Sequence, residues 1–489
     1  MLLKDLLTAA GYDILEQTQD IEINGISSDS RRVKKGDLFV AIKGLSDDGF
    51  CHIGEALLRG AVFVVAERRV MGVPSLLVEN ARAALARLFD AWYGHPARDL
   101  TLIGITGTNG KTSTSMMLAD ILAVAGHTCG VIGTVNATCG GEVLCAANAD
   151  RLANLTTPDP AELYRLLAEM RDRGAKYVVM EITSHALFFE KTAPLHFARA
   201  VFTNLTPDHL DLHGDMETYY QQKRRLFSQC DMGVISLFGP YGQQLLDTLE
   251  VPFFTVGRGN VRSVLASGDN GVSFRLDGPD ESIDLFLPVP GDFSVENGAL
   301  AAMTALSLGV PGETVKGALS AFRGVRGRME RVGENELGIS VFIDYAHTPD
   351  ALEKLLLTVR RFRRRGQRII LVFGCGGDRD RTKRRKMGRI ATRLADLTVL
   401  TSDNARSEDP NAIIADILKG IDKEKPYKIM ADRREAIEFA IDVAERGDIV
   451  LLAGKGHEEY EIRGRMRLPF SEREIVVECM AKKREGRGL

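Results

Sequence analysis

Several features that define common classes of protein are missing from this chain of 489 residues. Its seven cysteines are odd in number and include no Cys-x-x-Cys pair, so we expect neither a disulfide framework nor a zinc site. No run of 18 apolar residues occurs, and the amphipathic N-terminal pattern contains acidic residues, so we expect no membrane insertion and no signal peptide. The net charge of only -3 provides no field for a polyanion, which makes nucleic acid a poor partner. These absences predict a cytoplasmic protein.

The chain length and the order of its patterns predict three α/β domains. At roughly 100–200 residues per domain, 489 residues suggest about three. Apolar strand patterns alternate with helical ones, which predicts mostly parallel sheets covered by helices. In the last third, each strand runs into a polar loop containing Gly or Asp, as in a doubly wound, Rossmann-like domain. We place the domains at 1–97, 98–331 and 332–489. The clearest predicted strands are 100–106, 177–182, 198–203, 369–373, 397–401 and 449–453.

A glycine-rich segment lies between a predicted strand and a predicted helix. It reads Thr106-Gly107-Thr108-Asn109-Gly110-Lys111-Thr112, and the helical pattern continues from Ser113. Glycines let backbone N–H groups turn toward phosphate oxygens, the lysine adds a charge for the β- and γ-phosphates, and the last threonine can bind Mg²⁺. Ile105 stands where the strict motif has its first Gly, so a chance turn is the alternative. The strand and helix on either side favour a P-loop-type ATP-binding domain.

Further polar residues follow other predicted strands of the central domain. Glu181 ends the strand 177–182, where an acid can reach a nucleotide-bound metal, although such residues often only face solvent. The loop Asp208-His-Leu-Asp-Leu-His-Gly214 suits either a metal or phosphate site or a hydrogen-bonded turn. A zinc site is weakly indicated, because His209 and His213 lack the His-Glu-x-x-His context. Lys223 follows on a helix, and its local sequence gives it no role beyond a surface charge.

Taken together, these segments resemble the Mur ligases over nearly the whole chain. Beyond the two loops above, the similarity is carried by Thr156-Thr157-Pro158, Glu181-Ile-Thr-Ser-His-Ala-Leu187, Phe202-Thr-Asn-Leu-Thr-Pro207, Pro290-Gly-Asp-Phe293, Gly327-Arg-Met-Glu-Arg331, Asp344-Tyr-Ala-His347, Gly374-Cys-Gly-Gly-Asp-Arg379, Asp403-Asn-Ala-Arg406 and Gly454-Lys-Gly-His-Glu458. The resemblance implies a monomeric ligase that uses ATP and Mg²⁺ to add meso-diaminopimelate to UDP-N-acetylmuramoyl-L-alanyl-D-glutamate during cell-wall synthesis. It also implies an acyl phosphate intermediate, so no serine or cysteine nucleophile is needed.

The same resemblance assigns candidate site residues. The residues implied to bind Mg²⁺ are Thr112, Glu181, His209 and a carbamylated Lys223. Those implied to act in catalysis are Lys111, Glu181, His209 and Lys223. The nucleotide site adds Asn297, Arg328 and Asp344 to the glycine-rich loop. The UDP-precursor site comprises Ser28, Ser30, Leu45, Ser46, Asp47, Thr156, Thr157, Thr183 and Lys191. The diaminopimelate site comprises Arg379, Asp403, Asn404, Ala405, Arg406, Gly454 and Glu458.

The chain departs from the family pattern at four positions. Phe189 and Lys191 stand where relatives often have Gln and Arg, and a lysine cannot offer arginine's two-pronged donor. Ala405 replaces a proline, which changes the stiffness of the loop but keeps its charges. Glu472 stands where Asp is common.

Three alternatives remain open at the level of sequence. The same ligase could use L-lysine, but Arg406 suits the distal carboxylate that lysine lacks. A folylpolyglutamate synthetase would share the phosphate loop, but the segments 28–44 and 403–406 argue against it. A nucleotide-dependent switch or scaffold would explain residues 107–112 but not Arg379, Asp403–Arg406 and Glu458.

Overall fold

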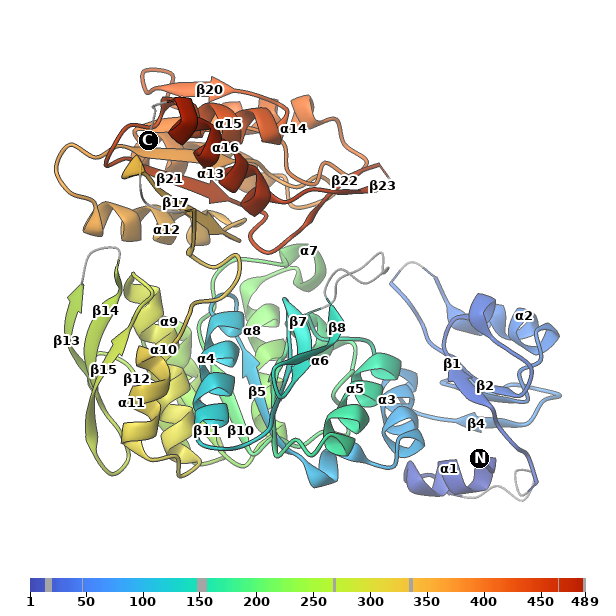
Figure 1. The fold of residues 1–489 in the computed structure, drawn as a ribbon. Helices are drawn as coiled ribbons and strands as arrows, with labels where there is room; N and C mark the ends of the chain where they lie inside the picture. The colour runs from blue at the N-terminus through green and yellow to red at the C-terminus, as the bar shows by residue number, and fades with distance from the viewer. Residues whose placement is uncertain are drawn as a thin grey trace.

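The computed structural model describes residues 1–13, 20–45, 47–146, 156–266, 270–333, 337–464 and 466–486. The chain forms three α/β parts, with the C-terminal part lying over the central part and the N-terminal part beside it (Figure 1). The predicted fold class is therefore confirmed. Among the helices of the described residues, none is long and apolar enough to cross a membrane.

The N-terminal part is a parallel sheet between two helical layers. Its strands lie in the order β1 (Gly25–Ser27), β2 (Asp37–Ala41), β3 (Phe63–Ala66) and β4 (Ser75–Leu77). The helices are α1 (Leu3–Ala9), α2 (Ile53–Leu58) and α3 (Ala81–Trp92), with 3₁₀ turns at Ser30–Arg32 and Gly49–His52. Alternate residues of β2 point to opposite faces. Leu38 and Val40 pack with α1 and α3, while Phe39 and Ala41 pack with α2.

The central part is built on an eight-stranded mixed sheet. The order is β12 (Phe253–Val256), β11 (Gly233–Ser236), β10 (Arg199–Phe202), β5 (Thr101–Thr106), β9 (Tyr177–Glu181), β6 (Cys129–Ile132), β7 (Asn136–Cys139) and β8 (Glu142–Ala146). The first six strands are parallel, and β7 and β8 form an antiparallel edge. A separate antiparallel sheet contains β13 (Val261–Ala266), β14 (Val272–Asp277) and β15 (Ser282–Leu287).

The helices of the central part bring the glycine-rich loop close to the C-terminal part. They are α4 (Lys111–Val124), α5 (Pro160–Asp172), α6 (Ser184–Phe188), α7 (Leu210–His213), α8 (Met216–Arg224), α9 (Pro240–Leu246), α10 (Asp292–Ser307) and α11 (Gly312–Ser320), with 3₁₀ turns at Pro96–Asp99 and Arg225–Gln229. Helix α10 packs against α4 and carries its apolar residues onto the small antiparallel sheet. Helix α7 lies on the side of the central part that faces the C-terminal part (Figure 1).

The C-terminal part is a doubly wound domain. Its sheet order is β16 (Glu330–Val332), β17 (Ser340–Asp344), β21 (Ile449–Ala453), β18 (Ile369–Phe373), β19 (Leu397–Leu400) and β20 (Tyr427–Ile429), and only β16 is antiparallel among them. A hairpin, β22 (Tyr460–Arg463) and β23 (Met466–Pro469), extends from it. The helices are α12 (Pro349–Phe362), α13 (Thr382–Leu394), α14 (Pro410–Leu418), α15 (Arg433–Val443) and α16 (Glu472–Gly486).

The six clearest predicted strands are confirmed, two of them with their exact limits, at Ile369–Phe373 and Ile449–Ala453. The antiparallel pieces were not predicted, namely β7–β8, β13–β15, β16 and β22–β23. Because ligands of doubly wound sheets bind at the carboxyl ends of the strands, the loops after β17, β18, β19 and β21 are the ones that matter for a site.

Candidate functional site

The glycine-rich loop between β5 and α4 has a backbone that only glycine accommodates at two points. Gly107 has φ 146°, and a Cβ there would lie 1.9 Å from Thr203 Oγ1. Gly110 has φ 87°, and its Cβ would meet Asn297 Oδ1 at 2.3 Å. The loop therefore packs against neighbouring polar side chains and delivers the N-terminus of α4, a favourable place for phosphate.

Two lysines converge on one carbonyl of this loop. Lys111 Nζ donates to Gly107 O and Thr108 O, both at 2.9 Å, and Lys223 Nζ donates to the same Gly107 O at 2.8 Å. Burial lowers the pKa of Lys111. Burial, followed by repulsion from Lys111, lowers the pKa of Lys223 well below its usual value. Lys223 is thus no surface charge, which corrects the interpretation from its local sequence: it is buried and lies over the Tyr219 ring.

Glu181 lies at the end of β9, beneath the start of α4. Its Oε2 accepts hydrogen bonds from Thr112 Oγ1 and Thr134 Oγ1, each at 3.0 Å, and its Oε1 accepts one from Thr134 N at 2.8 Å. Adjacent ligands of an octahedral Mg²⁺ lie roughly 2.9 Å apart, given metal–oxygen distances of about 2.1 Å. The Thr112 and Glu181 oxygens therefore fit two neighbouring positions around one Mg²⁺. Within the described residues, no three His, Cys, Asp or Glu side chains cluster as a self-sufficient metal site, so other ligands would be phosphate oxygens and water.

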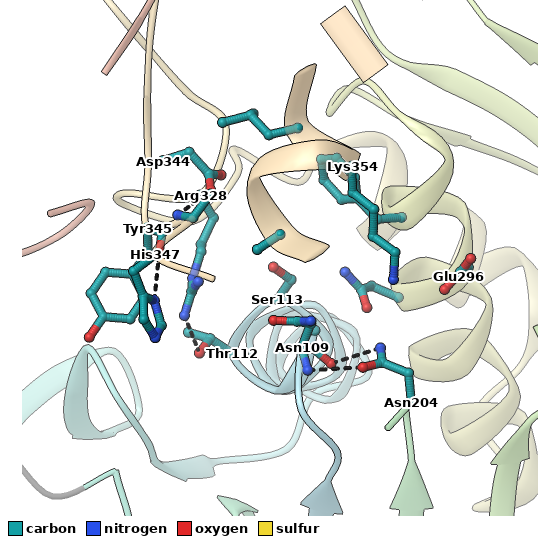
Figure 2. Close-up of a pocket in the computed structure, with 16 residues that line it drawn as sticks. Asn109, Thr112, Ser113, Asn204, Glu296, Arg328, Asp344, Tyr345, His347 and Lys354 are labelled. Atoms are coloured by element: carbon teal, nitrogen blue, oxygen red, sulfur yellow. Dashed lines mark hydrogen bonds between the residues drawn. The ribbon is translucent and has the colours of Figure 1, made fainter. Parts of the chain in front are cut away.

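A cavity opens between this loop, α10 and α12. Figure 2 shows Asn109, Thr112 and Ser113 on one side, Glu296 and Lys354 on another, and Arg328, Asp344, Tyr345 and His347 from the C-terminal side. Asn204 holds the loop in place, because its Oδ1 accepts from Asn109 N at 3.0 Å and its Nδ2 donates to Asn109 O at 3.1 Å. Apolar side chains on α10 and α12, Phe293, Ala351 and Leu355, line the same cavity. Phosphate groups at the loop and a flat base between the two helices both suit it.

The segment that joins the central and C-terminal parts reaches into this cavity. Arg328 Nη2 donates to Thr112 Oγ1 at 3.4 Å, and its guanidinium lies 4.7 Å from the Tyr345 ring centroid. The Asp344 carboxylate accepts from Met329 N at 2.7 Å and Ala346 N at 2.8 Å, so it fixes the turn that presents Arg328 (Figure 2). Asn297 lies beside Gly110 and accepts a bond from Thr114 Oγ1. All three predicted nucleotide residues outside the loop thus lie around the cavity.

A second cavity of about 450 Å³ lies next to the first, between the loop 207–210 and the C-terminal strand ends. His209 lines it with φ 52°, and its ring makes an edge contact with His185 at 4.8 Å. Burial lowers the pKa of His209 to about 4. The imidazole is therefore neutral near pH 7, the form that binds a metal. Among the predicted metal ligands, Thr112 and Glu181 are hydrogen-bonded to each other, whereas His209 lines the second cavity.

The predicted diaminopimelate residues meet at the C-terminal wall of the second cavity. Arg379, Asp403, Asn404, Arg406, Gly454 and Glu458 all line it. Burial, with repulsion from Asp403, raises the pKa of Glu458 to about 7. Arg406 has φ 52°, and its backbone is held by β22 through Ile462 O at 3.1 Å. Cation and carboxylates therefore face one enclosed space, as recognition of an amino acid requires.

Two members of this group have supporting rather than exposed side chains. The Asn404 amide donates to Glu458 Oε2 at 2.7 Å and accepts from buried Lys455 Nζ at 3.0 Å, so it positions these charges. Ala405 is buried in the apolar core and does not line the cavity. Beneath them, Arg433 and Glu472 form a fully buried ion pair at 2.8 Å. Arg433 also donates to Ser402 O and Ala453 O, which ties the loops after β19 and β21 together.

The predicted precursor residues fall into two groups. Ser28 and Leu45 follow β1 and β2 at the carboxyl edge of the N-terminal sheet, and both are exposed. Ser30 is buried and donates to Glu55 Oε2 at 2.6 Å, while Asp47 contacts His52 at 2.8 Å. Ser46 lies outside the described residues.

The second group lies beside Glu181, in the central part. Thr156 Oγ1 is 3.1 Å from Thr134 Oγ1, and Thr157 Oγ1 donates to Glu181 O at 2.8 Å and contacts Thr183 Oγ1 at 3.3 Å. Lys191 is buried and held by Asp159 Oδ1 at 2.8 Å and Thr157 O at 3.2 Å. It therefore supports the threonine loop rather than standing open to a ligand.

Some site residues were not singled out from the sequence. They are Thr134, Asn204, Glu296, Tyr345, His347, Lys354, Lys383 and Lys455. Asn204, Tyr345, His347 and Lys455 stand inside the strings that carry the family resemblance, each just after a strand, so that position was the available signal. Glu296, Lys354 and Lys383 lie on helices, where charged residues are ordinary.

Three models of Mur ligase domains match successive segments of the chain. The Mur ligase family, catalytic domain matches residues 22–93, the Mur ligase middle domain residues 105–306, and the Mur ligase, glutamate ligase domain residues 327–456. A UDP-N-acetylmuramoyl-L-alanyl-D-glutamate–2,6-diaminopimelate ligase of Clostridioides difficile is 40% identical, over 99% of this chain and 100% of that protein. A ligase of the same name from Gloeobacter violaceus is 42% identical, over 99% of both chains.

Solved structures agree with this likeness. A ligase of the same name superposes with a TM-score of 0.69 at 29% identity, covering 99% of both chains. At the level of fold alone, a MurF ligase of Thermotoga maritima in complex with ADP has a TM-score of 0.63 at 19% identity, over 96% of this chain and all of that one. A folylpolyglutamate synthase of Mycobacterium tuberculosis has a TM-score of 0.64 at 20% identity, over 76% of this chain and 92% of that one.

Proposed function

The chain belongs to the Mur ligase family, and we infer that it adds diaminopimelate to UDP-N-acetylmuramoyl-L-alanyl-D-glutamate in the synthesis of the peptidoglycan precursor. It is an ATP-dependent amide-forming ligase. The observation that carries this conclusion is the meeting of two cavities between the central and C-terminal parts. The first cavity suits a nucleoside triphosphate, and the second is lined by Arg406, Asp403 and Glu458.

We propose that the reaction proceeds through an acyl phosphate. The glutamate carboxylate attacks the γ-phosphate, ADP leaves, and the amine of the amino acid then displaces phosphate from the carbonyl carbon. For this reaction the protein must orient the reacting groups and neutralise the negative charge on the phosphates. Arg328 lines the nucleotide cavity, and Lys111 lies between the lining residues Gly110 and Thr112, so each can supply a cation to the phosphates. Closure of the C-terminal part over the loop keeps water from the acyl phosphate.

We further propose that Thr112 and Glu181 hold one Mg²⁺, with His209 and a carbamylated Lys223 beside a second. Bound Mg²⁺ would neutralise phosphate charge and fix its geometry. The 3.0 Å separation of Thr112 Oγ1 from Glu181 Oε2 supports the first position. The neutral imidazole of His209 and the depressed pKa of Lys223 support the second, because carbon dioxide reacts only with an unprotonated amine.

The precursor is proposed to extend from the N-terminal sheet to the phosphate loop. Its uridine end would bind near Ser28 and the segment 45–47, and its peptide end near Thr156, Thr157 and Thr183, which surround Glu181. Domain limits at residues 97 and 331, a monomeric state, the meso isomer of diaminopimelate and a cytoplasmic location complete the proposal. The requirement for ATP and a UDP-linked substrate supports that location.

The test of this function is a panel of amino acids. With UDP-N-acetylmuramoyl-L-alanyl-D-glutamate, ATP and Mg²⁺, release of phosphate should require diaminopimelate, and mass spectrometry should show one added residue on the precursor. Phosphate release with a folate and glutamate, in place of the precursor, would instead assign a folylpolyglutamate synthetase. Turnover of ATP without either acceptor would point to a nucleotide-dependent switch.

Lys223 provides a separate prediction. In buffer containing ¹³C-bicarbonate, the enzyme should show a carbamate carbon signal, because burial lowers the pKa of Lys223 and so increases the fraction of its amine that is unprotonated and can react with carbon dioxide. Lys223→Ala should remove that signal and reduce turnover at least roughly 100-fold, since a charge near the transferred phosphate is lost. Lys176→Ala, which removes an exposed lysine, should change neither measurement. An active enzyme with no carbamate signal at saturating bicarbonate would contradict the proposal.

A further inference from the structure

Two residues line both cavities, Tyr345 and His347, and both follow β17. They therefore stand where a group activated on the nucleotide side meets an amine arriving from the amino-acid side. Amide formation needs that amine without its extra proton, yet an amino acid carries it as ammonium near neutral pH. The residue at the junction is the natural place to look for a proton acceptor.

His347 has the right form for this task. Its Nδ1 lies 2.9 Å from the Tyr345 carbonyl oxygen (Figure 2). A carbonyl can only accept, so Nδ1 carries the hydrogen and Nε2 keeps its lone pair. The imidazole also packs on the Tyr345 ring, with 4.7 Å between ring centroids, which limits its rotation. The protein thus holds one tautomer in one orientation, as catalysis by a histidine base requires.

We infer that His347 Nε2 accepts the proton from the attacking amine of diaminopimelate, an inference that rests on the acyl phosphate route proposed above. The ammonium gives one proton to Nε2, and the freed lone pair forms the C–N bond to the acyl carbon. The C–O bond to phosphate then breaks, and its electron pair leaves with the phosphate. The nitrogen loses its second proton to the departing phosphate, and His347 later returns its own to water.

The surroundings of His347 couple its basicity to the progress of the reaction. Burial and the nearby Lys383 lower the pKa of His347 to about 4, with Arg328 acting in the same direction and Asp208 against it. Lys383 comes from α13, Arg328 from the joining segment and Asp208 from the loop before α7. The ring is therefore neutral when substrates bind. An acyl phosphate beside Arg328 adds negative charge, which raises the pKa of the ring when the amine arrives.

Hydroxylamine separates this role from binding of the nucleotide. It is an amine that is already unprotonated near pH 7, and it traps an acyl phosphate as a hydroxamate without help from a base. We would measure hydroxamate formation in the absence of diaminopimelate, and amide formation in its presence. The variants are His347→Gln and His347→Asn, which keep polar groups but have no basic nitrogen. His196→Gln, an exposed histidine paired with Asp231, is the control.

The expected result is a split between the two reactions. Amide formation by the His347 variants should fall roughly 10²–10⁴-fold, whereas hydroxamate formation should stay near that of the unmodified enzyme. Their remaining amide formation should rise about tenfold per pH unit below the pKa of the amine, because only free amine can then react. A parallel loss of both reactions, or a raised KM for ATP accompanying lost hydroxamate, would overturn the role. Absence of hydroxamate from the unmodified enzyme would instead refute the acyl phosphate route itself.

Discussion

A Lys111→Ala variant should remain folded and lose at least about a thousandfold in turnover. Lys111 begins α4, and its ammonium spans the glycine-rich loop through the Gly107 and Thr108 carbonyls. When ATP binds, phosphate oxygens offer that cation a stronger partner than two neutral carbonyls. Without Lys111, the negative charge that develops during phosphoryl transfer loses its nearest fixed positive charge.

The fold should survive because this lysine is costly to bury. Burial lowers the pKa of Lys111, and Arg328 opposes its charge further, although Glu181 partly offsets both. Thermal unfolding of Lys111→Ala should thus stay within a few degrees of the unmodified protein. The assay is phosphate release under saturating substrates, with Lys176→Ala as the control for loss of a surface charge. A folded Lys111→Ala enzyme with near-normal turnover would refute the assignment of the ATP site.

Local patterns predicted the parts of this molecule that depend on neighbouring residues. The strand before Gly107, the turn and the helix after Lys111 are contiguous, so their geometry follows from glycine, lysine and hydrophobic periodicity. Buried strands such as Ile369–Phe373 were clear for the same reason. The short antiparallel pieces were missed, because β7 and β16 have only a few residues and their pairing is decided by distant partners.

The roles of individual side chains were harder to predict, since they depend on contacts between distant segments. Asn204 secures Asn109 from 95 positions away, and its position just after a strand does not identify Asn109 as its partner. Asn404 stands in the predicted amino-acid site, but its amide is occupied by Glu458 and Lys455. Lys191 is predicted to contact the precursor, and the structure shows its ammonium paired with Asp159, a contact that the sequence did not predict. The family resemblance pointed to loops that line the two cavities, and packing determines which side chains in those loops are accessible.

Discrimination between diaminopimelate and L-lysine is the second large effect that we expect, and Arg406 is its source. Diaminopimelate differs from lysine by a carboxylate on the carbon that bears the distal amine. Arg406 lines the second cavity, and the structure gives its Nη1 only backbone carbonyls, Gly377 O at 2.8 Å and Asn404 O at 3.4 Å. A carboxylate would offer this guanidinium a charged, two-pronged partner in their place.

The surrounding acids suit the distal amine of the same substrate. Burial alone would raise the pKa of Asp403, but Lys455 and Arg433 lower it overall, so Asp403 is ionised. Glu458, with its pKa raised to about 7, gains its charge as pH rises through neutrality, and a bound ammonium would lower that pKa. Binding of diaminopimelate should therefore strengthen between about pH 6 and 8. Ala405, which replaces the proline of many relatives, is buried and changes none of these charges.

Lysine should be rejected roughly 10⁴–10⁵-fold in kcat/KM, because it would bury Arg406 without its carboxylate. Arg406→Ala should cost roughly 2–5 kcal/mol in kcat/KM for diaminopimelate. The same change should leave the KM for ATP almost unaltered, because Arg406 does not line the nucleotide cavity. Arg385→Ala, an exposed arginine on α13 outside the cavity, is the matched control and should behave like the unmodified enzyme. Equal turnover of both amino acids by the unmodified enzyme would refute this role of Arg406. If that turnover still required the precursor and ATP, the assignment as a ligase would stand.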